Sequence, residues 1–185
     1  MCRNDARPLP HRSITQNLEI RLRFQEFLLK MALDSHRWGA HMKVEDLIHS
    51  RTEVFSVTEE VTVYDTARYL REKQVRAVGV LKPDGKLLGV VSQSDISDKV
   101  AAENKCPAWM RVSEVMTPHP ITIPPATHLD ECVRLMEKHG IYHLPVVDEG
   151  GKYRGMISVQ DLLRVIASDE KARADMLESF LFSQR

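Results

Sequence analysis

Two short segments of this sequence place a serine and an aspartate at the spacing Ser-x-x-Asp, directly after a glycine and two apolar residues. They are residues 89–95 and 155–161. Short apolar runs are typical of buried strands, whereas Ser and Asp are typical of the first residues of a helix. The free backbone N–H groups of a helix start favour phosphate, and a carboxylate there can accept hydrogen bonds from two ribose hydroxyls. The pattern therefore favours a site for a nucleoside phosphate.

Each segment also has a simpler interpretation. Ser and Asp cap many helices without binding anything, so one isolated Ser-x-x-Asp is best explained as a cap. Two copies, each at a strand-to-helix corner, favour the binding site instead. The first corner holds Ser92, Ser94 and Asp95; the second holds Ser158 and Asp161, with the larger Gln160 in place of Ser94.

The two corners belong to an internal repeat that organises most of the chain. When the sequence is shifted by 66 residues, 75–100 falls on 141–166 without a gap, glycines and apolar positions included. Further upstream, 42–48 falls on 110–116 at a shift of 68, so the first copy carries two extra residues near 51–53. A shared period of this length indicates one structural unit present twice.

Each copy is predicted to fold in the order β-α-β-β-α. The expected strands before the first helices are 54–57 and 121–123, and those helices are 63–73 and 129–139, with Gly140 ending the second. Two strands joined by a tight turn follow, and the turn lies at 82–85 in the first copy and at 149–151 in the second. A further helix begins near Ser94 in the first copy and near Val159 in the second. The sequence thus predicts an α/β (α+β) protein in which the paired units form one module with pseudo-two-fold symmetry.

The expected organisation has four parts. Residues 1–40 are a polar tail and an amphipathic helix, 41–104 the first unit, 105–168 the second, and 169–185 a C-terminal helix. Both flanking helices carry mixed charges and an apolar face, which favours packing on the repeats or on a second subunit. Binding to a membrane surface is the alternative.

Composition excludes several classes of function. Lys and Arg together number 26, as do Asp and Glu, so no broad cationic surface for nucleic acid is expected. The three cysteines are odd in number and lack a CxxC spacing, which argues against a disulfide framework and favours the cytoplasm. The histidines form no HExxH pattern, which argues against a metal site. No apolar run is long enough for a membrane span. No nucleophile-base set or P-loop appears, so we do not expect an enzyme.

The two glycine-serine-aspartate corners, with Leu144–Val147 before the second and Val112–Thr117 opening its repeat, resemble the cystathionine β-synthase (CBS) domain. A tandem pair resembles a Bateman module, and the resemblance covers about 44–166. It implies two units packed through their sheets and clefts for AMP, ADP, ATP, NAD or S-adenosylmethionine. It also implies a homodimer through the module helices, a possible regulated protein target and no obligatory cofactor.

The resemblance implies a role for each candidate residue. Asp95 and Asp161 match the family's ribose-binding aspartate, and Ser92 and Ser158 its polar residue near the phosphate or ribose. Further candidates are Ser56 and Thr122 near the base, and Arg76, Ala77, Tyr142 and His143 where the family places phosphate-contacting residues. Arg76, Tyr142 and His143 also have ordinary explanations as surface or partly buried residues.

The predicted function is a regulatory or sensor module that binds an adenosine-containing ligand and signals by a shift between conformations. The alternative is a structural or partner-binding protein with empty clefts. Arg76-Ala77 in the first copy stands where the second has Tyr142-His143, so we expect the two clefts to differ in what they hold.

Overall fold

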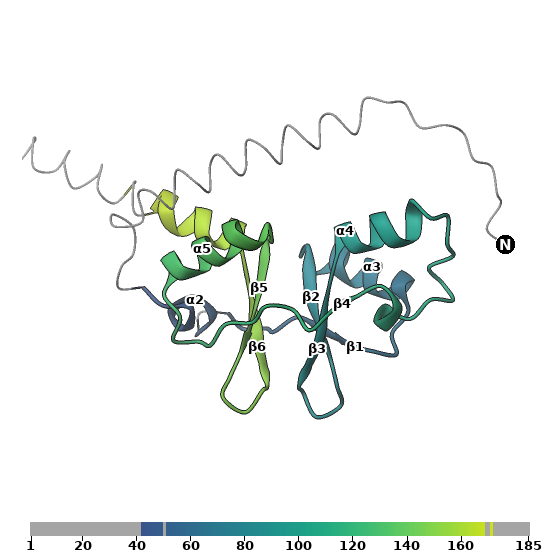
Figure 1. Cartoon of the computed structure of the whole chain (residues 1–185), viewed down its shortest axis with the longest axis horizontal. Helices are drawn as coiled ribbons and strands as arrows, with labels where there is room; N and C mark the ends of the chain where they lie inside the picture. The colour runs from purple at the N-terminus through teal and green to yellow at the C-terminus, as the bar shows by residue number, and fades with distance from the viewer. Residues whose placement is uncertain (1–41, 50, 169–170, 172–185) are drawn as a thin grey trace, which may run out of the picture.

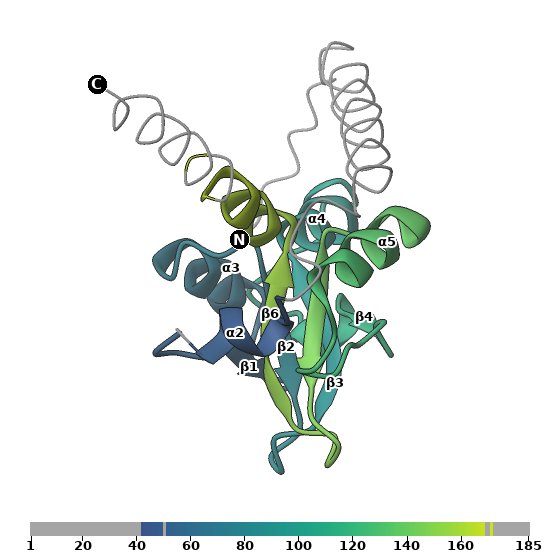
Figure 2. The same ribbon diagram turned by 90° about the vertical axis from the view of Figure 1, so that its left-hand side faces the viewer.

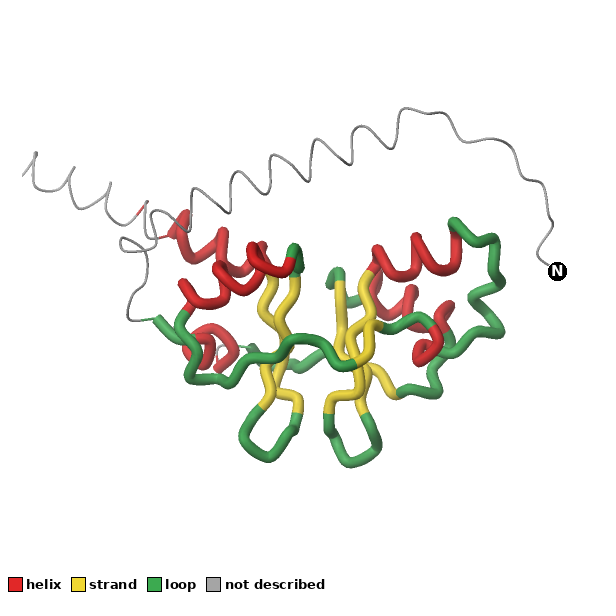
Figure 3. The backbone as a smooth tube through the Cα atoms, viewed as in Figure 1, coloured by secondary structure: helices red, strands yellow, loops and turns green. Residues whose placement is uncertain are grey.

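The computed structural model describes residues 42–49, 51–168 and 171. Two α/β units lie side by side, each with a β-hairpin near the centre of the molecule and helices outside it (Figures 1 and 3). The turns of both hairpins reach the same end, as the perpendicular view in Figure 2 also shows. The expected flanking helices fall outside the described residues, apart from Lys171.

The first unit has the predicted β-α-β-β-α order. Its elements are β1 (Ser56–Thr58), α3 (Val63–Glu72), β2 (Ala77–Leu81), β3 (Leu87–Ser92) and α4 (Gln93–Ile96), which continues as a π-helical turn at Ser97–Ala101. Strand β1 pairs with β2 in parallel, and β2 pairs with β3 antiparallel. Helix α2 (Val44–His49) precedes them.

The second unit repeats this order with a weaker first strand. After a 3-10 turn (Val112–Glu114) and β4 (Thr117–Pro118) come α5 (Leu129–His139), β5 (His143–Val147) and β6 (Tyr153–Ser158), then helix at 159–168. The strand expected at 121–123 is reduced to one parallel bridge, Ile123 with Val146. A mixed four-stranded sheet and a two-stranded antiparallel sheet, both flanked by helices, confirm the predicted fold class.

Local sequence explains the bounds of the two long helices. The hydroxyl of Thr62 caps α3 by accepting from the backbone N–H of Asp65 at 3.0 Å, and α3 buries Val63, Thr66 and Leu70. Helix α5 ends at Gly140, as predicted, and this residue adopts a left-handed φ of 62°. Glycine takes this conformation without steric penalty.

The leading segment of each repeat packs on the other repeat. Val44, fully buried on α2, joins the core of the second unit, and its N–H donates to the carbonyl of Thr127 at 2.9 Å. Val112, also fully buried, joins the core of the first unit and donates to the carbonyl of Val61 at 2.8 Å. Strand β4 accordingly pairs with β3 of the first unit. Neither unit therefore has a complete core on its own.

The hairpins meet in a small apolar interface between the units. Its buried members are Ala77, Val90, Tyr153 and Met156. Tyr153 packs so closely on Gly79 that a Cβ at that glycine would lie 2.9 Å from the tyrosine ring. The backbone N–H of Tyr153 also donates to the carbonyl of Gly85 at 3.2 Å. This contact joins the two hairpins and brings the two units together.

Candidate functional site

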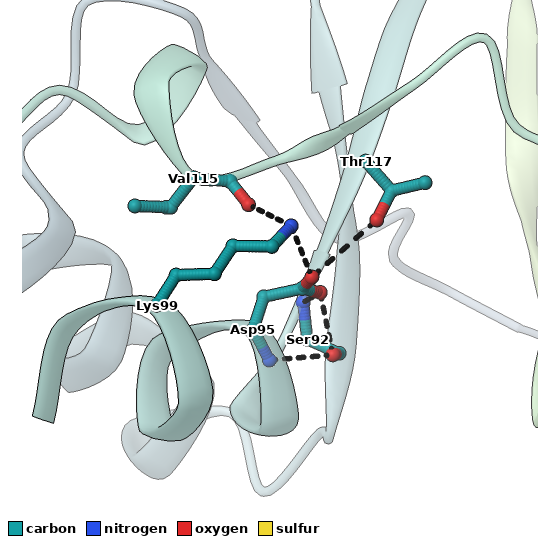
Figure 4. A network of polar contacts seen from close by, with 5 residues as sticks. All are labelled: Ser92, Asp95, Lys99, Val115 and Thr117. Carbon is teal, nitrogen blue, oxygen red and sulfur yellow. Dashed lines mark hydrogen bonds and ion pairs between the residues drawn. The ribbon is translucent and has the colours of Figure 1, made fainter. Parts of the chain in front are cut away.

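The first corner, Ser92 with Asp95, lies where β3 turns into α4 (Figure 4). Oδ2 of Asp95 accepts hydrogen bonds from the backbone N–H of Ser92 at 2.9 Å and from its hydroxyl at 2.6 Å. The hydroxyl oxygen in turn accepts from the backbone N–H of Asp95 at 3.2 Å. This reciprocal capping box holds one carboxylate oxygen in place.

The second oxygen of Asp95 faces a lysine (Figure 4). Nζ of Lys99 lies 2.8 Å from Oδ1 of Asp95 and also donates to the carbonyl of Val115 at 2.8 Å. The hydroxyl of Thr117, on β4, donates to the same Oδ1 at a longer 3.4 Å. The segment that leads into the second repeat, from Val112 to Pro118, crosses to the first unit. This crossing segment therefore lines one side of the first corner.

The surroundings of Asp95 favour its ionised form. Burial by itself raises the pKa of this carboxyl, but hydrogen bonds from Lys99 and Ser92 outweigh it, and the net effect lowers the pKa below its ordinary value. The side chain is only 16% exposed. A fixed, charged acceptor with restricted access to water suits hydrogen bonds from neutral hydroxyls.

The second corner, Ser158 with Asp161, has the same capping geometry. Oδ2 of Asp161 accepts from the backbone N–H of Ser158 at 2.7 Å and from its hydroxyl at 2.6 Å. Here the cation beside Oδ1 is Arg51, whose Nη2 lies 2.9 Å away. Arg51 also donates to the carbonyl of Met156 at 2.5 Å.

The two cations come from different places. Lys99 lies one turn after Asp95 on the same helix, and the residue 66 positions later is Val165. Arg51 comes from the segment between α2 and β1, where the first repeat carries its two extra residues. Thr117 on the other crossing segment contacts Oδ1 of Asp95 as Arg51 contacts Oδ1 of Asp161, so the two residues occupy matching places relative to the corners, yet one is charged and the other is neutral.

The strand starts beside the corners hold four of the predicted residues. The carbonyl of Arg76 accepts from the N–H of Gln93 at 2.9 Å, and that of Tyr142 accepts from the N–H of Val159 at 3.1 Å. Ala77 lies opposite Ser92 in the sheet register, and His143 lies opposite Ser158. Arg76 and Tyr142 are exposed, and Ala77 is buried.

His143 lies within the electric field of both corners. Burial lowers the pKa of His143 to about 4; the carboxylates of Asp161 and Asp95 act in the opposite direction, and Arg76 adds to the lowering. The imidazole is therefore neutral near pH 7, and it can donate or accept a hydrogen bond there without adding charge. Arg76 is the cation whose charge acts on this imidazole.

The remaining predicted residues lie away from these contacts. Ser56 is half-buried on β1 and pairs with Gly79, and Thr122 is exposed next to the bridge residue Ile123. Ser94 is exposed on the first turn of α4, and Gln160 is exposed at the matching place. The structure thus brings serine and aspartate together at each corner and leaves Ser56 and Thr122 on the first strand positions.

The glycines that open the two segments are required for different reasons. A Cβ at Gly89 would lie 2.7 Å from both the carbonyl oxygen of Thr117 and Sδ of Met116. Gly155 has a φ of 144°, which side chains rarely adopt. Close approach of the crossing chain is therefore the structural reason for glycine at position 89, and backbone conformation is the reason at position 155.

Sequence reasoning missed Lys99, Arg51 and Thr117. The spacing of Asp95 and Lys99, four residues apart on one helix, is the signal that predicts an ion pair. For Arg51 the only signal is the pair of extra residues near 51–53, because its partner lies in the other repeat.

No candidate metal cluster of His, Cys, Asp or Glu occurs in the described ranges. Across those same ranges, no helix combines the length and hydropathy needed to cross a bilayer.

Comparison with known proteins identifies the repeat. The chain is 28% identical over 116 residues to an uncharacterized protein of Methanopyrus kandleri, across 63% of this chain and 59% of that protein. The chain spans about three fifths or less of the curated relatives that match first. A structure with CBS domains from Burkholderia ambifaria is 32% identical and superposes with a TM-score of 0.64, covering 69% of this chain and 96% of the other.

A further structure has the same fold at lower identity. The CBS domain pair of protein MJ0100, in complex with 5′-methylthioadenosine and S-adenosyl-L-methionine, is 23% identical with a TM-score of 0.63 and covers 69% of this chain and 98% of that one. The CBS domain family model matches residues 44–102 and 112–168. These ranges contain the two serine-aspartate corners and make up more than half of the sequence, so this chain belongs to the CBS domain family as a tandem pair.

Proposed function

We propose that this chain is a sensor module that binds an adenosine-containing ligand at its serine-aspartate corners and signals by a change of conformation. One observation carries the proposal: both corners use Oδ2 of the aspartate for the helix cap and keep Oδ1 for a cation that a ligand can displace. A ribose offers two adjacent hydroxyl donors, which suit such an oxygen. AMP, ADP, ATP, NAD and S-adenosylmethionine all contain this group.

The other candidate residues have proposed roles around that ribose. The backbone at Ala77 and the side chain of Arg76 would lie toward the phosphate of a ligand at the first corner, with Tyr142 and the neutral imidazole of His143 toward the second. Arg76 would supply charge, whereas His143 would supply a hydrogen bond. Ser56, Thr122 and Ser94 are proposed to contact the base or the ribose.

Two further observations support a ligand of this class. The CBS pair of MJ0100, which shares the fold, is bound to two adenosine compounds. The leading segment of each unit, which carries Thr117 or Arg51, packs on the other unit. A ligand that contacts an aspartate and the crossing segment therefore touches both units and would favour one of their relative positions.

Calorimetric titration tests the proposal directly. AMP, ADP, ATP, NAD and S-adenosylmethionine are titrated into the unsubstituted chain and into an Asp95→Asn/Asp161→Asn double variant, in which the amide oxygen keeps an acceptor for the helix cap. We expect at least one ligand to bind and the double variant to bind it at least about tenfold more weakly, from the loss of charge-assisted hydrogen bonds. Asp98→Asn, an exposed carboxylate on the same helical segment, is the matched control. Unchanged binding by the double variant contradicts the proposal.

A ligand-free partner-binding protein is the second candidate. Lys99 and Arg51 already satisfy the second aspartate oxygen at each corner, so the corners are self-contained ion pairs. Failure of all five ligands to bind the unsubstituted chain, together with a stable complex from cell extract, would favour this candidate.

We propose further that the chain is not itself an enzyme. Burial, followed by the nearby carboxylates of Glu131 and Asp130, raises the pKa of Cys132 to about 12, so this thiol stays protonated and is a poor nucleophile. We also propose a cytoplasmic homodimer assembled through the module helices, with a protein target and no nucleic acid. Light scattering of the purified chain tests the dimer: a monomer mass would contradict it.

A further inference from the structure

The segment between α2 and β1 brings Arg51 to the aspartate of the opposite unit. Its guanidinium makes two contacts there, one to Oδ1 of Asp161 at 2.9 Å and one to the carbonyl of Met156 at 2.5 Å. The arginine side chain is 32% exposed and that of Asp161 is 20% exposed. Both side chains keep partial contact with water, so solvent partly screens this ion pair. A ribose hydroxyl that approached Oδ1 would therefore meet a competitor that it can displace.

A displaced guanidinium remains tethered beside the second corner by its own backbone. Arginine presents five donors in a planar fork that fits the oxygens of a phosphate. At the matching place of the first corner, Thr117 carries no charge, and the lysine of that corner belongs to the same helix as its aspartate. Of the two corners, the second is therefore the one whose crossing segment carries a cation that can exchange the aspartate for an anionic ligand group.

We propose that Arg51 makes the second corner selective for adenosine ligands with an anionic 5′ group. The inference rests on the proposed function and extends it to the class of ligand. A 5′-phosphate gives the displaced guanidinium a new partner of opposite charge. A neutral thioether or a cationic sulfonium at the same position leaves that charge without one, which disfavours binding.

A pair of ligands that differ only at the 5′ position tests this selectivity. AMP carries a phosphate there and 5′-methylthioadenosine a neutral thioether. Both are titrated into Asp95→Asn, which leaves the second corner intact, and into Asp95→Asn/Arg51→Gln. We expect Arg51→Gln to weaken AMP by about tenfold through loss of a charge-assisted contact. It should strengthen 5′-methylthioadenosine by up to about fivefold, since the competing ion pair is gone.

Two further variants separate this role from a general effect on structure. Arg68→Gln removes an exposed arginine that pairs with Glu72 on α3 and should leave both affinities unchanged. Thr117→Arg, in an Asp161→Asn background, places an arginine at the matching position of the first corner. It should shift the preference of that corner toward AMP in the same direction.

The outcomes distinguish the inference from the function on which it rests. Equal changes for the two ligands in Arg51→Gln, or no change, overturn the inference and leave adenosine binding in place. Binding that disappears entirely in Asp95→Asn also overturns it, because the second corner would then hold neither ligand. If the unsubstituted chain binds no adenosine compound at all, the proposed function itself is wrong.

Discussion

The two repeats build the same corner and surround it with different residues. In both, the serine hydroxyl lies 2.6 Å from Oδ2 of the aspartate that follows three residues later. The cation beside Asp95 belongs to the same helix, whereas the cation beside Asp161 crosses from the other unit. Local sequence is thus sufficient to form the corner, but the charge it meets depends on the partner unit. Two sites made by duplication can therefore diverge without any change in the Ser-x-x-Asp motif.

The corners meet different cations, but the crossing segments that lead into the two repeats pack in the same way. Val44 and Val112 are each fully buried in the core of the other unit. Truncating either to alanine is expected to lower the free energy of unfolding by about 2 kcal/mol, from lost burial and the cavity left behind. In Val44→Ala, hydrogen-exchange protection should fall in α5 and β5; in Val112→Ala, it should fall in α3 and β2. Loss of protection confined to the mutated repeat would contradict the reciprocal packing.

The ends of the two long helices differ by one residue at a matching position. Gly140 and Gln74, 66 residues apart, both adopt a left-handed φ, 62° and 54°. A side chain is strained in this conformation and glycine is not. Gln74→Gly should therefore stabilise the chain by about 1 kcal/mol and Gly140→Ala should destabilise it by a similar amount. Denaturant unfolding measures both changes; the same sign for the two would show that backbone conformation does not determine them.

The smallest expected effect concerns the lysine that distinguishes the first corner. The folded-state pKa of Asp95 is lowered, so its interactions contribute stability at pH values above the ordinary pKa of about 3.9, and that stability is lost as the pH falls through the folded-state value. Lys99→Met should raise the pKa of Asp95 and reduce stability at pH 7 by less than about 1 kcal/mol. Titration of the Asp95 carboxyl carbon by NMR measures the shift.

A similar ion pair elsewhere provides the control for Lys99→Met. Arg134 and Asp130 are four residues apart on α5, with 3.0 Å between Nη2 and Oδ2. Arg134→Met should leave the pKa of Asp95 unchanged. An unchanged pKa in Lys99→Met would mean that the lysine does not determine the charge state of the first corner.

Periodicity and repetition were sufficient to predict most of the fold. The bounds of α5, the end of that helix at Gly140 and the serine-aspartate corners follow from local preferences, which both copies express. The reciprocal exchange of Val44 and Val112 could not be predicted, since an apolar residue fits the core of either repeat equally well. The first strand of the second unit is reduced to a single bridge at Ile123. This could not be predicted from the sequence either, because strand length depends on the neighbouring chain.

The chemistry of the candidate site was predicted less completely than its framework. Asp95 and Asp161 are predicted as candidates because their motif is local and occurs twice. Arg51 was missed because its partner is 110 residues away, in the other repeat. The lowered pKa of His143 depends on burial in the folded chain, which no local pattern predicts.

A crystal structure of the chain grown with AMP tests the central claim most directly. The account predicts the 2′ and 3′ hydroxyls of the ribose at Oδ1 of Asp95 or Asp161, in the place that Lys99 or Arg51 occupies without ligand, with the serine-aspartate cap unchanged. Well-ordered AMP bound elsewhere, with both ion pairs intact, would contradict the claim that the corners are the ligand sites.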